Sequence, residues 1–389
     1  METPLLVVGV VSLSGWVILA IDIATSAKFV RYVDQVPLPS RDAMAAFPRV
    51  TVVVPARNEE RHLAGAMRSI LSLDYPDLEI IAVDDRSDDR SGEILDELAA
   101  IDSRLRLLHV NELPDGWLGK NHALQCAAEE ATGELILFTD ADVFFEPTVL
   151  ARAVASVREG DLDHLTIAAD VRTPSLLVEM FVVAFAVSFV GFFRPWRMGD
   201  PSSSATIGIG AFNLVRKQTY FEAGGHRPIA MRPDDDLKLA SLLRDHGARQ
   251  AFGTAGRMVA VEWYSSLREA FRGLEKNSLA AVDFKPWILL GGAPAQLLTM
   301  CWPFVALFVT NGPLRWLNAT IVVLLLVGQM VLLQGGSLRW WTAFLLPVAI
   351  PLLIIAYLRA VLLTYVRGGI RWRGTFYSLE ELRQEGHRQ

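Results

Sequence analysis

The sequence predicts an α/β domain built on a mostly parallel sheet and joined to helices that cross a membrane. Between Val50 and Pro147, short apolar strands alternate with helical segments at the spacing typical of a parallel, helix-covered sheet. Outside this region, several apolar stretches reach about 20 residues, the length of one bilayer crossing. Hydrophobic residues make up 52% of the chain, which is more than a soluble enzyme needs.

The first apolar stretch runs from Pro4 to Ala24 and predicts a transmembrane anchor within residues 1–25. A signal peptide is the alternative, but the run has no basic residues before it and no clear small-x-small cleavage site. Lys28 and Arg31 follow directly. The positive-inside rule therefore places the next domain in the cytoplasm.

Residues 26–47 include Pro37 and Pro39 and are expected to form an extended linker before the α/β domain, which covers residues 48–285. No Gly-x-Gly-x-x-Gly motif opens the first helix of that domain, so a nucleotide must be held without the usual dinucleotide fingerprint. The expected strands are 50–54, 79–83, 105–110 and 134–138, and the expected helices end near Leu73, Ala100 and Ala131, with a fourth starting at Pro147.

Paired carboxylates stand at the ends of two of these strands. Asp140 and Asp142 follow Phe138 at the carboxyl edge of the sheet, where open α/β sheets bind ligands. Two acids this close repel each other unless a cation lies between them, and a divalent ion that carries substrate phosphates fits. Asp84 and Asp85 end the neighbouring strand and can accept hydrogen bonds from a uracil imide or from ribose hydroxyls. Turn formation and capping are the plainer alternatives for both pairs.

Two further groups are candidates for the chemistry. Lys120 follows Gly119 at the start of a helix and offers a compact cation to a diphosphate, although a solvated helix lysine has the same appearance. Asp234, Asp235 and Asp236 precede another helix, where they can act as a cap. Three crowded acids also raise at least one pKa, which suits a general base that deprotonates a hydroxyl.

Three motifs, in this order, resemble those of the family 2 glycosyltransferases, which have the GT-A fold. The resemblance covers residues 48–285, and the motifs are Val54-Pro55-Ala56-Arg57-Asn58-Glu59, Val83-Asp84-Asp85-Arg86-Ser87 and Asp140-Ala141-Asp142. It implies a nucleotide-sugar donor and a divalent cation, Mg²⁺ or Mn²⁺.

The resemblance assigns roles to the candidate residues. The metal would be held by Asp142, with Asp140 on the metal or on the ribose. The family has an acidic pair before a Leu-Ala dipeptide, here Leu239-Ala240, which makes Asp236 the base. Asp235 takes that role if the alignment shifts by one residue. The donor would contact Pro55, Arg57, Glu59, Asp84, Asp85, Lys120 and Asp140.

A narrower resemblance is to the membrane-bound branch that includes ceramide-glucosyltransferase-like and carotenoid- or hopanoid-associated enzymes. It rests on residues 115–124, on Trp372-Arg373-Gly374-Thr375-Phe376-Tyr377, and on a Gly-x-x-Lys-Asn variant at residues 273–277. Arg272 and Lys276 lie at i and i+4 of this helix, so both can face the donor diphosphate. The Gln/Arg-x-x-Arg-Trp motif of many relatives is absent from the sequence, which argues against a processive polysaccharide synthase.

Leu176–Phe193 is apolar enough to span a membrane. A crossing there would separate Asp142 from Asp236, so we expect a helix in the membrane interface over about 176–197, anchored by Arg194, Trp196 and Arg197. A buried core helix is the alternative.

The region 286–366 holds three more apolar stretches with internal prolines, 286–311, 314–334 and 341–365. Three full crossings would place the basic tail, 367–389, outside, against the charge rule. A re-entrant stretch and a tail that is an exception to the rule are the two alternatives.

Together these observations predict an inverting, metal-dependent glycosyltransferase that transfers sugar from a UDP-sugar to a lipid-type hydroxyl. Its expected location is the cell (inner) membrane, as a multi-pass protein with a cytoplasmic catalytic domain. A polysaccharide synthase and a catalytically silent membrane scaffold are the alternatives. The net charge of −6 and the lack of a basic run do not indicate a nucleic-acid partner. Cys126 and Cys301 form neither a disulfide framework nor a zinc pattern.

Overall fold

The computed structural model describes residues 2–372 and 375–384, and it divides the chain into two compact units. The sheet unit comprises Phe29–Val171 and Arg194–Glu262. The helical unit comprises the residues up to Lys28, Arg172–Phe193 and Trp263–Arg383. Residues 172–193 and 263–285, expected in the α/β domain, thus group with the apolar helices.

The sheet unit contains an eight-stranded sheet in the order β1-β10-β7-β9-β5-β2-β3-β4. Only β9 runs antiparallel to its neighbours, so the predicted, mostly parallel sheet is confirmed. Its strands are β1 (Arg31–Tyr32), β2 (Val50–Ala56), β3 (Leu78–Asp85), β4 (Leu105–Val110), β5 (Leu135–Phe138), β7 (His164–Ala168), β9 (Asn213–Arg216) and β10 (Gln250–Thr254).

The segment expected to be an extended linker, 26–47, contributes part of this sheet. Arg31 and Tyr32 of β1 pair in parallel with Gly253 and Thr254 of β10, and Val33 is completely buried. A short helix, α2 (Arg41–Met44), follows and is capped by the hydroxyl of Ser40. The two-residue pairing is too short to give a periodic signal in the sequence.

A second, three-stranded sheet has the order β6-β11-β8. Its strands are β6 (Val143–Phe145), β11 (Val259–Val261) and β8 (Asp170–Val171). Residues 139–142 are therefore the short connection between the end of β5 in the large sheet and the start of β6 in the small one.

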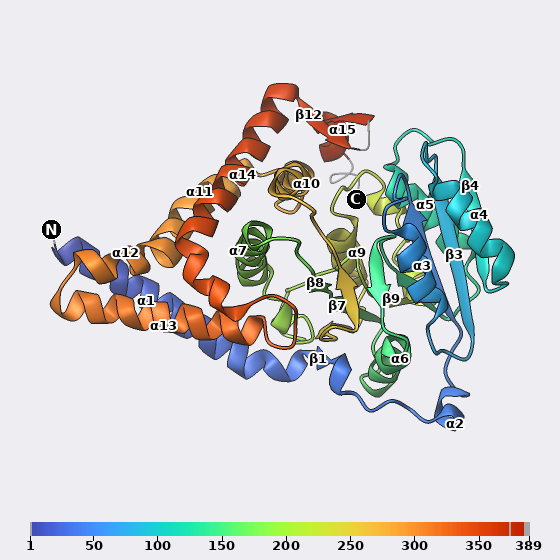
Figure 1. Ribbon diagram of the computed structural model, residues 1–389, viewed down its shortest axis with the longest axis horizontal. Coiled ribbons are helices and arrows are strands. Elements are labelled where there is room, and N and C mark those ends of the chain that lie inside the picture. The colour runs from blue at the N-terminus through green and yellow to red at the C-terminus, as the bar shows by residue number, and fades with distance from the viewer. Residues whose placement is uncertain (1, 373–374, 385–389) are drawn as a thin grey trace. The chain divides into compact units, whose positions relative to one another are not determined.

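Six helices cover the two faces of the large sheet. Residues of β2 point alternately to each face, as a strand period of two requires. Val52 and Val54 pack with α3 (Leu63–Leu71), α4 (Ser91–Ile101) and α6 (Val149–Glu159). Val53 packs with residues of α5 (Gly119–Glu130), α8 (Lys217–Glu222) and α9 (Asp235–Asp245). Figure 1 shows α3 and α4 beside β3 and β4.

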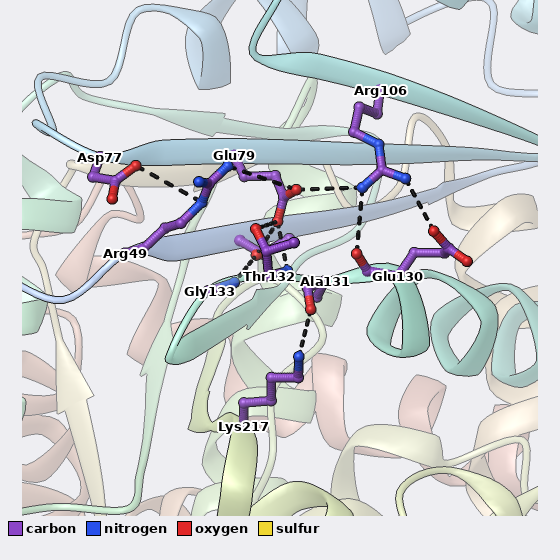
Figure 2. A network of polar contacts seen from close by, with 10 residues as sticks. Arg49, Asp77, Glu79, Arg106, Glu130, Ala131, Thr132, Gly133 and Lys217 are labelled. Atoms are coloured by element: carbon purple, nitrogen blue, oxygen red, sulfur yellow. Dashed lines mark hydrogen bonds and ion pairs between the residues drawn. The ribbon is translucent and has the colours of Figure 1, made fainter.

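A network of hydrogen bonds and ion pairs lies at the end of the sheet where β2, β3 and β5 begin (Figure 2). Its centre is Glu79, which is 4% exposed. One carboxylate oxygen accepts hydrogen bonds from the Thr51 hydroxyl at 2.6 Å and from the backbone N–H and hydroxyl of Thr132 at 2.8 and 2.9 Å. The guanidinium groups of Arg49 and Arg106 lie 3.8 and 3.4 Å from the other carboxylate oxygen of Glu79. The network joins three parts of the chain at the edge opposite the strand-end acids.

The helical unit contains the long apolar helices. Within the described residues, five helical segments are long and apolar enough to cross a membrane: Pro4–Phe29, Leu176–Arg197, Pro286–Val309, Gly312–Leu332 and Trp340–Arg367. These lie at the stretches that the sequence singled out. The helices of this unit are α1 (Glu2–Ser26), α7 (Leu176–Phe193), α10 (Leu267–Ala280), α11 (Pro286–Gln296), α12 (Trp302–Val309), α13 (Gly312–Leu332), α14 (Leu346–Arg367) and α15 (Leu379–Gln384).

Local breaks in these helices follow the prolines. Pro294 lies inside α11, and a π-helical turn, Leu297–Cys301, separates α11 from α12. The Trp16 indole of α1 donates a hydrogen bond to the Thr299 carbonyl in this turn at 3.2 Å. Beyond α14, β12 (Gly369–Trp372) and β13 (Thr375–Ser378) form an antiparallel pair; Arg373 and Gly374 of the predicted motif lie outside the described residues.

Helix α7 packs inside the helical unit through its first half. Residues 178–184 are buried, and the carboxylate of Glu179 pairs with Arg339, whose Nε lies at 2.8 Å. The residues expected to anchor its end at a membrane interface belong to the sheet unit. Trp196 is only 6% exposed and Arg197 pairs with Asp200 at 2.6 Å; their role as a membrane anchor stays a prediction.

Candidate active site

The two acids of the Asp-Ala-Asp motif are held where the two sheets meet. The Thr139 N–H donates to the Val53 carbonyl of β2, and the Asp140 N–H donates to the Gly210 carbonyl at 3.1 Å. The Thr139 hydroxyl also donates to the Ala211 carbonyl at 2.8 Å. The connection between β5 and β6 is thus tied to the segment that precedes β9, which fixes the position of Asp140.

Gly210 is required by this close approach. A Cβ atom at this position would lie 2.6 Å from Oδ2 of Asp140, well inside van der Waals contact. The Gly210 N–H also donates to Oδ2 of Asp236 at 2.9 Å. One glycine therefore borders both the metal-motif acid and the predicted base.

Lys120 bridges the two groups of acids. Its ammonium nitrogen lies 2.9 Å from Oδ1 of Asp140 and 3.2 Å from Oδ2 of Asp235. Burial alone would lower the pKa of Lys120, but the carboxylates of Asp140, Asp235 and Asp236 raise it, so the side chain stays charged. Residues from α5, the end of β5 and the start of α9 are brought together around one cation.

The acidic triplet before α9 divides into three different environments. Nε and Nη2 of Arg232 donate to the two carboxylate oxygens of Asp234, each at 2.9 Å. Asp235 faces Lys120. Asp236 accepts hydrogen bonds from the N–H groups of Gly210 and Leu237, yet burial and the charge of Asp235 raise its pKa to about 7. A pKa near 7 suits a base that acts at neutral pH.

Asp142 has a similarly perturbed carboxyl. Burial raises its pKa to about 7, and the charges of Asp140 and Glu59 add to this. Within residues 2–372 and 375–384, no group of three or more His, Cys, Asp or Glu side chains could hold a metal ion alone. The donor set fits a divalent ion that takes one or two carboxylates here and the remaining oxygens from a substrate diphosphate, the pattern typical of Mg²⁺.

Asp85 and Arg57 lie on the adjoining strand ends. Arg86 donates to both oxygens of Asp85 at 2.7 and 3.0 Å, and Nη1 of Arg57 lies 3.8 Å from the same carboxylate. A Cβ on Gly119 would collide with Asp85, so this acid is pressed against the start of α5, one residue from Lys120.

The loops that carry the other predicted donor residues are tied to each other. The Glu59 N–H donates to the Ser91 hydroxyl at 2.8 Å, and the Asp88 N–H donates to Oδ1 of Asn58 at the same distance. Pro55 belongs to β2 and is half-buried. Asp84 is turned away from Asp85: it accepts from the Ser87 N–H and lies 3.3 Å from the His109 ring.

Lys120, Asp140, Asp235 and Asp236 line one cavity, whose lining does not include Asp85 or Asp142 and adds residues that the motifs did not single out. Gly210 lies just before β9, Asn213 is the first residue of β9, and His226 follows the Gly224-Gly225 turn. The double glycine before a histidine was a visible signal, whereas Asn213 sits in an ordinary apolar strand. The lining is Lys120, Leu124, Phe138, Thr139, Asp140, Gly210, Asn213, His226, Asp235, Asp236 and Leu239.

Asn213 is oriented by a buried chain of polar groups. Its Oδ1 lies 2.9 Å from Nε2 of His164, and Nδ1 of His164 lies 3.2 Å from the Gln250 amide nitrogen. Burial lowers the pKa of His164 to about 4, so the ring is neutral at pH 7. The neutral ring can donate to Asn213 and accept from Gln250.

A second, open hollow of about 490 Å³ lies along the other side of α5. Trp117 and His122 form an edge-to-face pair there, with ring centroids 5.5 Å apart. The Asp115–Leu124 motif therefore contributes to two spaces: Trp117 lines this hollow, and Lys120 lines the cavity that contains the site acids.

Arg272 and Lys276 lie on α10 in the helical unit. The ammonium group of Lys276 lies over the ring of Trp372 at 4.1 Å, a cation–π contact. The contact of these two residues with a donor stays a prediction.

Comparison with known proteins places the central region in a family. Residues 51–218 match the family described as Glycosyl transferase family 2. A probable glycosyltransferase of Bacillus subtilis, YdaM, is 35% identical over 104 residues, which is 26% of this chain and 24% of the relative. The chain thus spans about a quarter of that protein.

Two longer matches extend beyond this region. The 4,4'-diaponeurosporenoate glycosyltransferase of Staphylococcus aureus is 23% identical over 355 residues, covering 85% of this chain and 89% of the relative. The solved mannosyltransferase PcManGT of Pyrobaculum calidifontis, in complex with GDP-Man and Mn²⁺, is 19% identical, covers 92% of this chain and 99% of that one, and superposes with a TM-score of 0.57. The α/β fold is thus shared with a glycosyltransferase, and residues 51–218 are a family 2 glycosyltransferase domain of the GT-A type.

Proposed function

We propose that this protein is an inverting glycosyltransferase that moves a hexose from a UDP-sugar to the hydroxyl of a membrane lipid. The observation that carries the proposal is one cavity in a family 2 domain that collects Lys120, Asp140, Asp235 and Asp236. A catalytically silent scaffold would have no use for buried acids whose pKa values are raised to about 7.

Asp236 is the base in this proposal. Its carboxylate would take the proton of the acceptor hydroxyl as that oxygen attacks the anomeric carbon and the nucleotide diphosphate leaves. The Gly210 and Leu237 N–H groups hold the carboxylate in one orientation, and burial raises its pKa toward neutrality. Asp235, paired with Lys120, is the alternative base.

The donor diphosphate is proposed to lie near Lys120 and the Asp140–Asp142 connection. Mg²⁺ or Mn²⁺ bound by Asp142, with Asp140, would neutralise the charge that develops on the leaving diphosphate. Lys120 already places a positive charge beside Asp140 and can contact the same diphosphate. Arg57, Glu59, Asp84 and Asp85, on tied strand-end loops, are proposed to contact the base and ribose, with Pro55 shaping the loop.

A lipid acceptor and an inner-membrane location are also proposed. Five candidate spanning segments and the long match to a diaponeurosporenoate glycosyltransferase support them. The catalytic domain would face the cytoplasm, where nucleotide sugars are made, with α7 in the membrane interface and Arg272 and Lys276 close to the donor.

The proposal is tested by incubating the purified full chain with labelled UDP-hexoses and a host lipid extract, with and without Mn²⁺. The expected result is a labelled glycolipid whose anomeric configuration is opposite to that of the donor. A water-soluble polymer as product would favour a polysaccharide synthase, and no transfer from any donor would favour the scaffold. Retention of the anomeric configuration would contradict the inverting mechanism.

A further inference from the structure

His226 belongs to the Gly224-Gly225-His226 turn, and this turn is built to place one ring. Gly224 and Gly225 have φ of 92° and 66°, a backbone region that favours glycine. A Cβ on Gly225 would lie 2.6 Å from the Gln125 side-chain oxygen. His226 itself is only 1% exposed, although it lines the cavity that holds Lys120 and the site acids.

The ring of His226 is held from behind by two other buried side chains. Its Nδ1 lies 2.7 Å from the Tyr220 hydroxyl oxygen, and that oxygen lies 3.2 Å from the Gln125 side-chain oxygen. The His226 N–H also donates to the same oxygen at 2.8 Å. Whichever of these two neighbours takes the Tyr220 proton, Nδ1 is engaged by Tyr220, and Nε2 is the ring nitrogen that remains for a ligand.

The ring of His226 also lines the cavity that contains Lys120 and the site acids. Phe138, the last residue of β5, packs edge-to-face with His226 at 5.2 Å, and Asp140 follows two residues later. Burial and the nearby charge of Lys120 lower the pKa of His226 to about 3, so the ring stays neutral. A neutral ring nitrogen suits a sugar hydroxyl, which can donate or accept a hydrogen bond as the tautomer requires.

We propose that His226 is a specificity-determining residue, which forms at Nε2 a hydrogen bond with one hydroxyl of the transferred sugar. The inference rests on the proposed function and adds the group that distinguishes one hexose from another. A site built to bond a hydroxyl discriminates strongly against a sugar that presents it in another direction, because the buried ring nitrogen is then left without its partner.

Two substitutions separate this role from a packing role. His226→Asn keeps a polar atom near the position of Nδ1, facing Tyr220, and removes the one near Nε2. His226→Gln does the reverse. Each variant is assayed as the full chain with UDP-glucose, UDP-galactose and UDP-N-acetylglucosamine, and kcat/KM is compared between donors. The affinity for UDP alone and the Tm serve as controls for folding.

The expected result is that His226→Asn loses about tenfold or more of the preference between donors, while its affinity for UDP stays as in the unaltered chain. His226→Gln should keep the ranking of donors, even if its Tm falls because the Tyr220 contact is lost. The inference is overturned if His226→Asn keeps the wild-type preference, or if the two variants lose it equally. Failure of the proposed function is visible separately, because the unaltered chain would then transfer sugar from no donor, and the inference would fall with it.

Discussion

Lys120 provides the positive charge at the centre of the cavity, within 3.2 Å of acids from two different elements. We expect Lys120→Met to lower kcat/KM by about a hundredfold or more, because Asp140 and Asp235 would repel each other and the diphosphate would lose a cation. Steady-state kinetics measure this. Lys217→Met removes the same charge at the opposite edge of the sheet, where Lys217 contacts the Ala131 carbonyl, and should leave transfer almost unchanged. Equal losses in both variants would contradict the role of Lys120.

Asp236 gives a prediction on pH. A base must be deprotonated to act, and the pKa of this carboxyl is about 7, so kcat/KM should rise as the pH increases through 7. Asp236→Asn should lower transfer by about a hundredfold or more and abolish this rise, while nucleotide binding persists. If Asp235→Asn alone had that effect, the base would be Asp235, one position earlier.

Asp142 gives a prediction on metal dependence. Asp142→Asn should abolish the stimulation of transfer by Mg²⁺ or Mn²⁺ and leave the protein folded, because the substitution removes a charge that is repelled by Asp140 and Glu59 in the free chain. Transfer is measured over a metal titration after chelation. Asp77→Asn, at the far edge of the sheet, is the matched control. Undiminished stimulation in Asp142→Asn would refute the metal assignment.

At the scale of elements, the network around Glu79 is the main polar link between the starts of β2 and β3 and the end of α5 (Figure 2). Glu79→Gln should destabilise the protein by about 1–3 kcal/mol, because a buried charge-assisted acceptor is lost. A lower Tm by thermal unfolding in detergent, with kcat per folded molecule unchanged, is the expected measurement. A change in donor specificity would show that the network acts on the site.

The same network has a defined pH dependence. Burial alone would raise the pKa of Glu79, but hydrogen bonds from Thr51 and Thr132 and the charge of Arg49 lower it below the usual value. A lowered folded-state pKa stabilises the protein at pH values above the unfolded pKa of about 4.3, and this contribution is lost as the pH falls through the folded value. Glu79→Gln should therefore lose less stability than the unaltered chain on acidification.

At the scale of the whole molecule, the two cysteines allow the orientation of the chain to be tested. Cys126 lies on α5 and is half-buried, and Cys301 is buried in the helical unit; both are free thiols. If the catalytic domain faces the cytoplasm, a membrane-impermeant maleimide should label Cys126 in inverted vesicles and not in intact cells. Cys126→Ser is the control for specificity. Labelling of Cys126 in intact cells would place the domain outside.

The alternation of strands and helices from Val50 to Glu159 could be predicted because it is local. Each buried strand is a run of apolar residues, each helix has its own period, and strand-end acids such as Asp85 and Asp140 follow within one or two residues. The apolar segments were equally visible, since a length near 20 residues is a property of the chain alone.

What the sequence by itself determined is therefore the elements, their order and the residue types at the strand ends. The tertiary structure alone decided which of them meet. Lys120 lies between Asp140 and Asp235, and Asp236 accepts a hydrogen bond from Gly210. His226 lines the cavity, and its ring is held there by Tyr220. The tertiary structure also decided that β1 joins the sheet and that α7 packs with the helical unit. The physical reason is that these outcomes depend on contacts between residues tens to hundreds of positions apart, which packing selects and no local pattern records.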